Sequence, residues 1–189
     1  MPRIDMSNEL FHWTKGQTDE DAFEVLYRIV SERRLLGGQK MRRGQHTSIS
    51  FTEAPIDCFQ STPSNYGRFG IGVSKPWLFE IGGRPVIYQP SHDYDLLHPT
   101  IQWRHVTYDL REGATVDYAW LREWRIPTEE LFLDDDEFFV LVPHQKWADE
   151  INRRHDAAEY EWAHSIEVKT GDWIDPGPFW YRTYVYSAD

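Results

Sequence analysis

Two polar side chains stand inside aromatic segments that lie far apart in the chain. His12 falls between Phe11 and Trp13, and Glu123 stands between an arginine and a tryptophan. An imidazole on a strand can donate a hydrogen bond to a ligand hydroxyl, with Thr14 on the same strand face two residues away. A carboxylate such as that of Glu123 can hold a sugar 2-hydroxyl and stabilise an oxocarbenium-like transition state, as carboxylates do in glycosidic cleavage. We therefore take His12 and Glu123 as the candidate catalytic pair.

Each member of this pair also has an ordinary structural interpretation. A lone histidine in an apolar strand more often packs in a core or at an edge than acts on a ligand. Glu123 and Arg125 share one face of the expected strand, and solvated ion pairs of this kind are common. The residues alone leave both alternatives open.

Serines and aromatic residues in the middle of the chain could also contact a ligand. Ser48 and Ser50 share one face of a strand, where two hydroxyls can bind a ribose or a carboxamide, or simply face solvent. In residues 66–74, three glycines weaken a strand unless something approaches its backbone closely. Tyr66 and Phe69 could then sandwich a flat ring such as nicotinamide, or they could pack in an ordinary bulged strand.

A metal-dependent alternative lies near the C-terminus. A strand-like stretch there contains Glu167 and Lys169, a Glu-x-Lys pattern typical of nucleases in which acidic groups hold Mg²⁺ and lysine supports the attacking water. Asp149 or Asp156 would supply the missing acid. The acidic run 134–137 has no EF-hand spacing, and the eight histidines show no His-Glu-x-x-His pattern. No metal is expected at the first site.

Hydrophobic spacing predicts the elements that must position these groups. Thr18 can cap a helix with Asp21 at its third position, and the glycine pair 37–38 ends that helix. A second helix is expected from residue 145 to about residue 160. Strands are expected at 10–16, 47–51, 66–74, 85–88, 101–108, 120–126, 138–142, 165–169 and 179–186. The pattern predicts an α+β class, with one compact domain over residues 1–189, mixed or antiparallel sheets and flanking helices.

Composition narrows the class of protein. Of the 189 residues 40% are hydrophobic and 15% aromatic, including nine Trp, which is enough to bury a core and to stack flat ligands. The net charge of −11 argues against broad nucleic-acid binding. The single Cys58 excludes an intramolecular disulfide and a Cys-based zinc site. Because no signal-peptide pattern and no run near ~20 apolar residues is present, we expect a soluble cytoplasmic protein.

The ordered series of these segments resembles a known family. It is similar to the AbiGi-type abortive-infection family of phage-resistance proteins, and its layout resembles the wider ADP-ribosyltransferase fold. The segments that carry the resemblance are 11–15, 50–55, 66–77, 85–88 and 122–125. The resemblance implies an NAD-dependent mono-ADP-ribosyltransferase-like effector of toxin type in antiphage defence, with NAD as its substrate.

The resemblance also implies a role for each candidate residue. It places His12 on the NAD ribose, Tyr66 or Phe69 against nicotinamide, and Glu123 as the catalytic carboxylate. We expect His12, Ser50, Tyr66 and Glu123 to line one pocket. The other candidate NAD-binding residues are Trp13, Thr14, Ser48 and Arg125. The expected partners are NAD, a protein or nucleic-acid target and an antitoxin or regulatory protein, with no membrane.

Two functions from other classes remain as alternatives. One is a Mg-dependent nuclease that uses Glu167 and Lys169. The other is a non-catalytic binding module, because a strongly acidic, aromatic-rich chain suits a basic partner.

Overall fold

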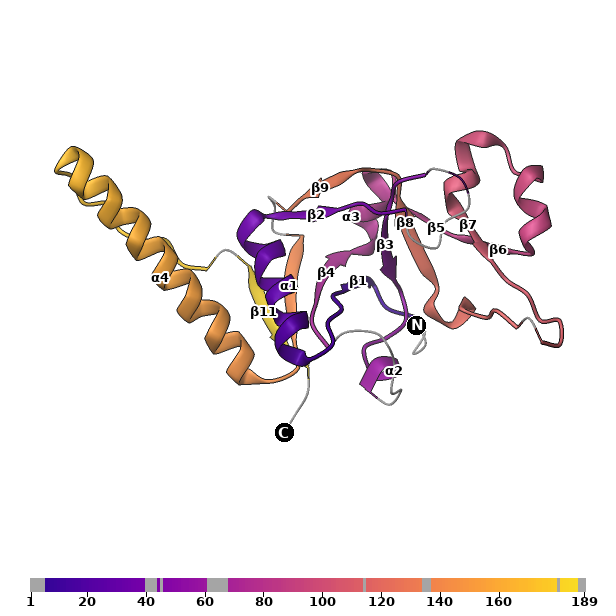
Figure 1. Ribbon diagram of the computed structural model, residues 1–189, viewed down its shortest axis with the longest axis horizontal. Coiled ribbons are helices and arrows are strands. Elements are labelled where there is room, and N and C mark those ends of the chain that lie inside the picture. The colour runs from indigo at the N-terminus through magenta and orange to yellow at the C-terminus, as the bar shows by residue number, and fades with distance from the viewer. Residues whose placement is uncertain are drawn as a thin grey trace.

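The structure is a computed structural model that describes residues 6–39, 44, 46–60, 68–113, 115–133, 137–179 and 181–186. Its centre is a seven-stranded sheet in the order β11-β10-β4-β1-β3-β8-β5 (Figure 1). Every pairing in this sheet is antiparallel except the parallel pair of β10 with β11. The strands are β1 (Glu9–Trp13), β3 (Ile49–Thr52), β4 (Gly70–Ser74), β5 (Arg84–Pro85), β8 (Glu123–Ile126), β10 (Phe138–Val142) and β11 (Arg182–Val185).

Strand alternation gives the sheet two apolar faces. Leu10, Phe51 and Trp124 belong to the larger cluster, which packs against the helices. Phe11 and Trp13 point the other way and form a second cluster with Leu141 and neighbouring aromatic rings. With flanking helices on a mixed sheet, the chain forms one compact α+β fold, as the hydrophobic spacing predicts.

The first helix, α1 (Asp19–Glu32), begins as predicted and ends earlier than predicted. The Thr18 hydroxyl accepts from the backbone N–H of Asp21, and the Asp21 carboxylate accepts from the backbone N–H of Thr18, which completes a capping box. The helix ends at Arg33, which adopts a left-handed conformation (φ 53°). The glycine pair 37–38 therefore does not end it, because strand β2 (Arg34–Leu36) intervenes and pairs with β9 (Glu130–Phe132).

Short elements replace two of the longer predicted strands. Residues 101–108 divide into the end of a 3-10 helix, η2 (Pro99–Arg104), and strand β7 (His105–Thr107), which pairs in parallel with β6 (Ile87–Gln89). Residues 120–122 belong to the 3-10 turn η3 (Ala119–Leu121) and its left-handed end, so only 123–126 form a strand. The remaining short helices are α2 (Asp57–Gln60), α3 (Lys75–Glu80) and η1 (Ser91–Leu96).

The last helix, α4 (Gln145–Thr170), is much longer than predicted. It runs through residues 165–169, which were expected to be a strand, and ends at Gly171 with φ 81°. Its first half buries Trp147, Ala148 and Ile151 against the core, and the helix then projects away from the sheet (Figure 1). Among the helices in the described parts of the chain, none combines the length and the apolar character that a membrane crossing requires.

Candidate functional site

The Glu123 carboxylate is held by two donors on the central strand pair. The β3–β8 register places Ser50 opposite Arg125 and Thr52 opposite Glu123, so all four side chains leave the sheet on one face. The Ser50 hydroxyl and the Arg125 Nε each donate to Oε1 of Glu123 at 2.7 Å. Within the described residues, no hydrogen bond reaches the second oxygen, Oε2. One carboxylate oxygen is thus fixed by two donors, and the side chain as a whole is 16% exposed.

Arg125 is itself fixed by backbone carbonyl groups. Its Nη1 donates to the carbonyl oxygens of Trp103 at 3.0 Å and His105 at 2.9 Å. Its side chain is 6% exposed and that of Glu123 is 16% exposed. A buried ion pair is tolerated only when further hydrogen bonds satisfy both charges, and these carbonyls meet that need for the guanidinium. Arg125 therefore orients Glu123 and is not itself open to a ligand.

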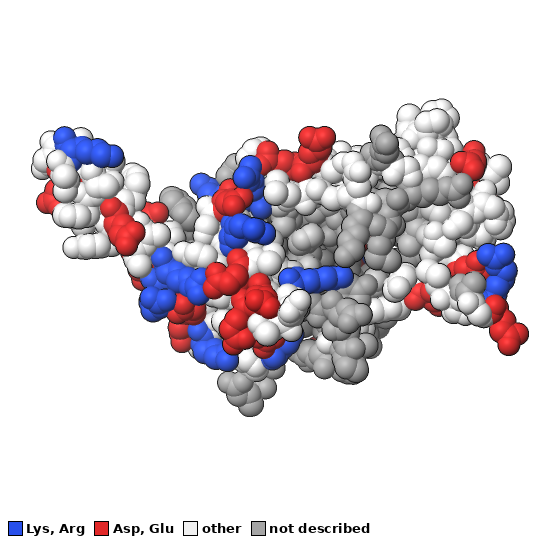
Figure 2. Space-filling model, in the orientation of Figure 1, with Lys and Arg blue, Asp and Glu red and all other residues white. Residues whose placement is uncertain are grey.

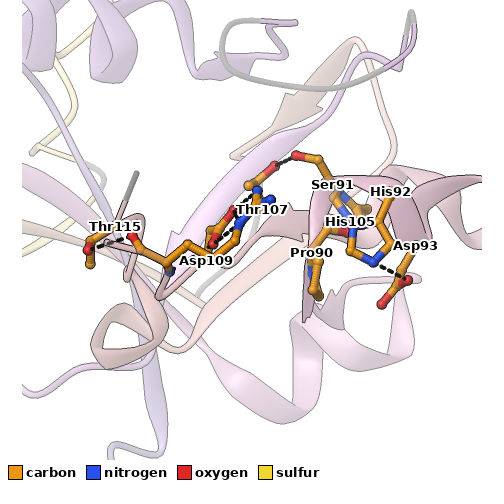
Figure 3. Close-up of polar contacts among 9 residues, drawn as sticks. Pro90, Ser91, His92, Asp93, His105, Thr107, Asp109 and Thr115 are labelled. Atoms are coloured by element: carbon orange, nitrogen blue, oxygen red, sulfur yellow. Dashed lines mark hydrogen bonds and ion pairs between the residues drawn. The ribbon is translucent and has the colours of Figure 1, made fainter. Parts of the chain in front are cut away.

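A small lobe built from β6, β7, η1 and η2 supplies those carbonyls. The His105 ring is buried there, with its Nε2 donating to the Pro90 carbonyl at 3.4 Å. Ser91 and Thr107 join their hydroxyls at 3.1 Å across the same lobe (Figure 3). Tyr94 packs edge-on against the His105 ring. These contacts fix His105, whose carbonyl accepts a hydrogen bond from Arg125.

Tyr88, a residue that was not predicted for the site, also contacts Glu123. The Tyr88 hydroxyl accepts from the Glu123 backbone N–H at 2.9 Å and donates to the Tyr118 carbonyl at 3.2 Å. Tyr88 lies on β6, so this contact ties the start of β8 to the lobe. The sequence carries no signal for it, because it depends on a backbone group and on the placement of a neighbouring strand pair.

His12 reaches the same region from the other side of the sheet. Its Nδ1 donates to the Ser50 carbonyl at 2.8 Å, and its ring lies edge-on to Phe51. Alternation along β1 places His12 with Leu10 on the helix-covered face, opposite to Glu123. The structure therefore does not bring the two side chains into one pocket. It connects them through Ser50, whose carbonyl binds His12 and whose hydroxyl binds Glu123.

Burial governs the charge state of His12. Desolvation lowers the pKa of this imidazole below its ordinary value, and the hydrogen bond to the Ser50 carbonyl only partly opposes the shift. The ring is therefore neutral at pH 7. Because Nδ1 carries the donated proton, Nε2 is left as the acceptor nitrogen.

The remaining candidate residues have structural roles or lie elsewhere. Thr14 is buried and donates to the Ala22 and Phe69 carbonyls, which joins α1 to β4. Phe69 is fully buried against Phe23 and Trp147, so its ring has no exposed surface for nicotinamide. Trp13 packs in the second apolar cluster. Tyr66 lies outside the described residues.

Ser48 and the glycines of β4 were also candidates for contact with a ligand. The Ser48 hydroxyl is buried and has no hydrogen-bond partner in the described parts of the chain. A Cβ at Gly72 would collide with the Phe139 ring, and one at Gly70 with the His12 carbonyl. The close approach that these two glycines permit is therefore made by neighbouring strands of the same sheet.

A second carboxylate, directly after β3, was not among the predicted site residues. Glu53 is buried, and it accepts from the Lys75 Nζ and the Trp124 Nε1, both at 2.9 Å. Both carboxylate oxygens are bonded, so this group ties α3 to β8.

The nuclease alternative loses its structural basis. Glu167 and Lys169 lie in α4, where positions two apart point about 200° away from each other. A strand would have placed them on one face, and the helix separates them. No group of three or more His, Cys, Asp or Glu side chains suited to a metal ion occurs in the described ranges.

Comparison with known proteins gives no relative for this arrangement. No family model, curated protein or solved structure matches the chain.

Proposed function

We propose that this protein is an NAD-dependent mono-ADP-ribosyltransferase of toxin type, in which Glu123 is the catalytic carboxylate. The observation that carries the proposal is the binding of Oε1 by both Ser50 and Arg125, which leaves Oε2 for a substrate.

The proposed reaction breaks the bond between nicotinamide and the ribose of NAD. Nicotinamide leaves as a neutral molecule with the electron pair of that bond, and positive charge develops on the sugar. The Glu123 carboxylate stabilises this charge and accepts a hydrogen bond from the ribose 2-hydroxyl through Oε2. A nucleophilic group of the target then bonds to the anomeric carbon and releases its proton to solvent.

His12 is a positioning residue in this proposal. Its hydrogen bond fixes the β3 backbone at Ser50, and Ser50 in turn fixes Glu123. No single ligand contacts both His12 and Glu123 in this proposal, because the two side chains leave the sheet on opposite faces.

The biological part of the proposal rests on the resemblance of the sequence segments to AbiGi-type proteins. The protein would act as an effector in antiphage defence and modify a protein or nucleic-acid target. An antitoxin or regulatory protein would hold it inactive until infection. The ADP-ribosyltransferase-like form of the fold belongs to the same proposal.

The test compares two glutamates that are both paired with arginine. Purified protein is incubated with NAD and a cell extract, and nicotinamide release and labelled ADP-ribose transfer are measured. Glu123→Gln should lower both by about a hundredfold, as loss of an electrostatic catalyst typically does. Glu130→Gln is the matched control, because Glu130 pairs with Arg34 at 2.7 Å on the peripheral β2–β9 sheet. Its activity should stay within about twofold of the parent.

Binding is measured separately from turnover. NAD at ten times its Kd should stabilise the folded protein by about 1.4 kcal/mol, seen as a rise in melting temperature. Full activity in a folded Glu123→Gln variant would refute the role of this carboxylate. An inactive parent protein with no NAD-dependent stabilisation, with and without cell extract, would favour the binding module.

A further inference from the structure

The outer part of α4 exposes aromatic side chains far from the Glu123 site. We define the α4 arm as residues 156–175, which are the second half of the helix and the first residues after it. Within α4, which is described throughout, Ala163 is the single buried residue beyond Ile151. Figure 1 shows this half extending past the sheet, and in Figure 2 much of its surface is uncharged. The arm therefore adds little to the core.

Four of its exposed residues form a continuous stripe. Tyr160, His164 and Val168 are spaced four apart and so share one face of the helix. The rings of Tyr160 and His164 stack, and Trp173 packs on Tyr160 with 5.7 Å between ring centroids. Tyr160 is 58% exposed, Val168 73% and Trp173 43%. We call these four residues the aromatic stripe.

Acidic residues border the aromatic stripe. Helical geometry places Asp156 and Glu167 along one side of it and Glu161 along the other. His164 contacts Glu167 at 3.5 Å, which confirms that the acid lies at this edge. Six acidic residues and one lysine give the arm a formal net charge of −5. Lys169, the one basic residue, lies on the opposite side of the helix from Tyr160.

We propose that the aromatic stripe is a docking surface for a basic amphipathic helix of a partner protein. Exposed Tyr and Trp side chains are typical anchors of protein interfaces, since their large rings lose little conformational entropy when buried. Apolar residues of the partner cover the stripe, and its lysines or arginines pair with the bordering acids. A second copy of this chain is disfavoured because it would bring two arms of charge −5 together. The surface is independent of the Glu123 chemistry.

The test uses two synthetic 18-residue helical peptides with leucines on one face. One carries lysines on its other face, and the second carries glutamates at the same positions. Fluorescence anisotropy of the labelled peptide is measured against the full-length protein at low and moderate salt. The lysine peptide should bind and saturate at one peptide per chain, and added salt should weaken it. The glutamate peptide should not bind.

Matched variants locate the surface. Tyr160→Ala and Trp173→Ala should each weaken the lysine peptide by roughly tenfold or more. Trp162→Ala is the control, because this tryptophan is exposed on the same helix but about 200° from Tyr160, and it should change binding by less than about twofold. Circular dichroism checks that each variant keeps its helix content.

Three results would overturn the proposal. They are no binding of the lysine peptide, equal binding of the glutamate peptide, and a Trp162→Ala variant that weakens binding as much as Tyr160→Ala does. Sedimentation of the protein alone provides a further check. Self-association that Tyr160→Ala abolishes would show that the occupant is a second copy and not a basic helix.

Discussion

Two glutamate–arginine pairs of equal length occupy different environments in this molecule. Glu123 and Arg125 join at 2.7 Å within strand β8, and Glu130 and Arg34 join at 2.7 Å across the paired strands β9 and β2. In the first pair the arginine side chain is 6% exposed, and in the second it is 40% exposed. The distance between the two charged groups therefore does not by itself tell how much an ion pair contributes to the stability of the fold. Desolvation and the surrounding hydrogen bonds decide it.

The surroundings of the two pairs differ accordingly. Arg125 donates to two backbone carbonyls, and Ser50 donates to Glu123. The Arg34 guanidinium divides its hydrogen bonds between Glu130 and Glu32 at the surface. Removing one member of the first pair leaves a buried charge without its opposite charge. In the second pair, water replaces the lost partner.

The largest expected effect separates the pairs by stability. Arg125→Ala should lower the free energy of unfolding by about 3–5 kcal/mol, because it leaves the buried Glu123 carboxylate without its positive partner. Arg34→Ala should lower it by at most about 1 kcal/mol. Urea unfolding of both variants checks this. Small and equal losses would show that Glu123 and Arg125 are solvated like the surface pair.

A smaller effect is expected from the hydroxyl that holds Glu123. Ser50→Ala should cost about 1.5–3 kcal/mol, since it removes a hydrogen bond to a charged group. Ser48→Ala is the control two residues earlier in the chain, because its buried hydroxyl has no partner in the described part of the chain and its loss should cost nothing. Urea unfolding is again the measurement. A Ser48 variant as unstable as the Ser50 variant would contradict the assigned contact.

The smallest expected effect concerns pH and the His12 link to Ser50. Because burial lowers the pKa of His12 in the folded state, the unfolded chain takes up this proton first as pH falls below about 6.5. His12 therefore destabilises the fold progressively below that pH and contributes nothing to the slope above it. His12→Gln should lose less stability between pH 7.5 and 5 than the parent. Thermal melts across this range measure the difference, and identical profiles would refute it.

Local signals predicted the elements that depend on local chemistry. The capping box of Thr18 and Asp21 marked the start of α1, and the apolar run 138–142 matched β10. Prediction failed at residues 165–169, where Ile166 and Val168 alternate like a strand. The helix-forming residues that precede them continue α4 to Thr170, so helix continuation outweighed the β-branched residues.

The candidate site was only partly predictable from the sequence, because part of it depends on strand pairing and on backbone groups. Period-two alternation placed Glu123 and Arg125 on one face, and the structure shows them there. The register that sets Ser50 opposite Arg125 depends on strand pairing across more than seventy residues. The carbonyl groups of Trp103 and His105 are invisible to any residue-type pattern, because every residue has one.

The parallel pairing of β10 with β11 has a consequence for how the chain can vary in length. A parallel pair needs a crossover between its strands, and α4 lies in that connection. The 26 residues of α4 span about 39 Å at ~1.5 Å each, whereas the five residues of β10 span about 17 Å. The crossover is thus more than twice as long as the strand that it has to match. Insertions or deletions at its far end therefore need not shift the register of the sheet.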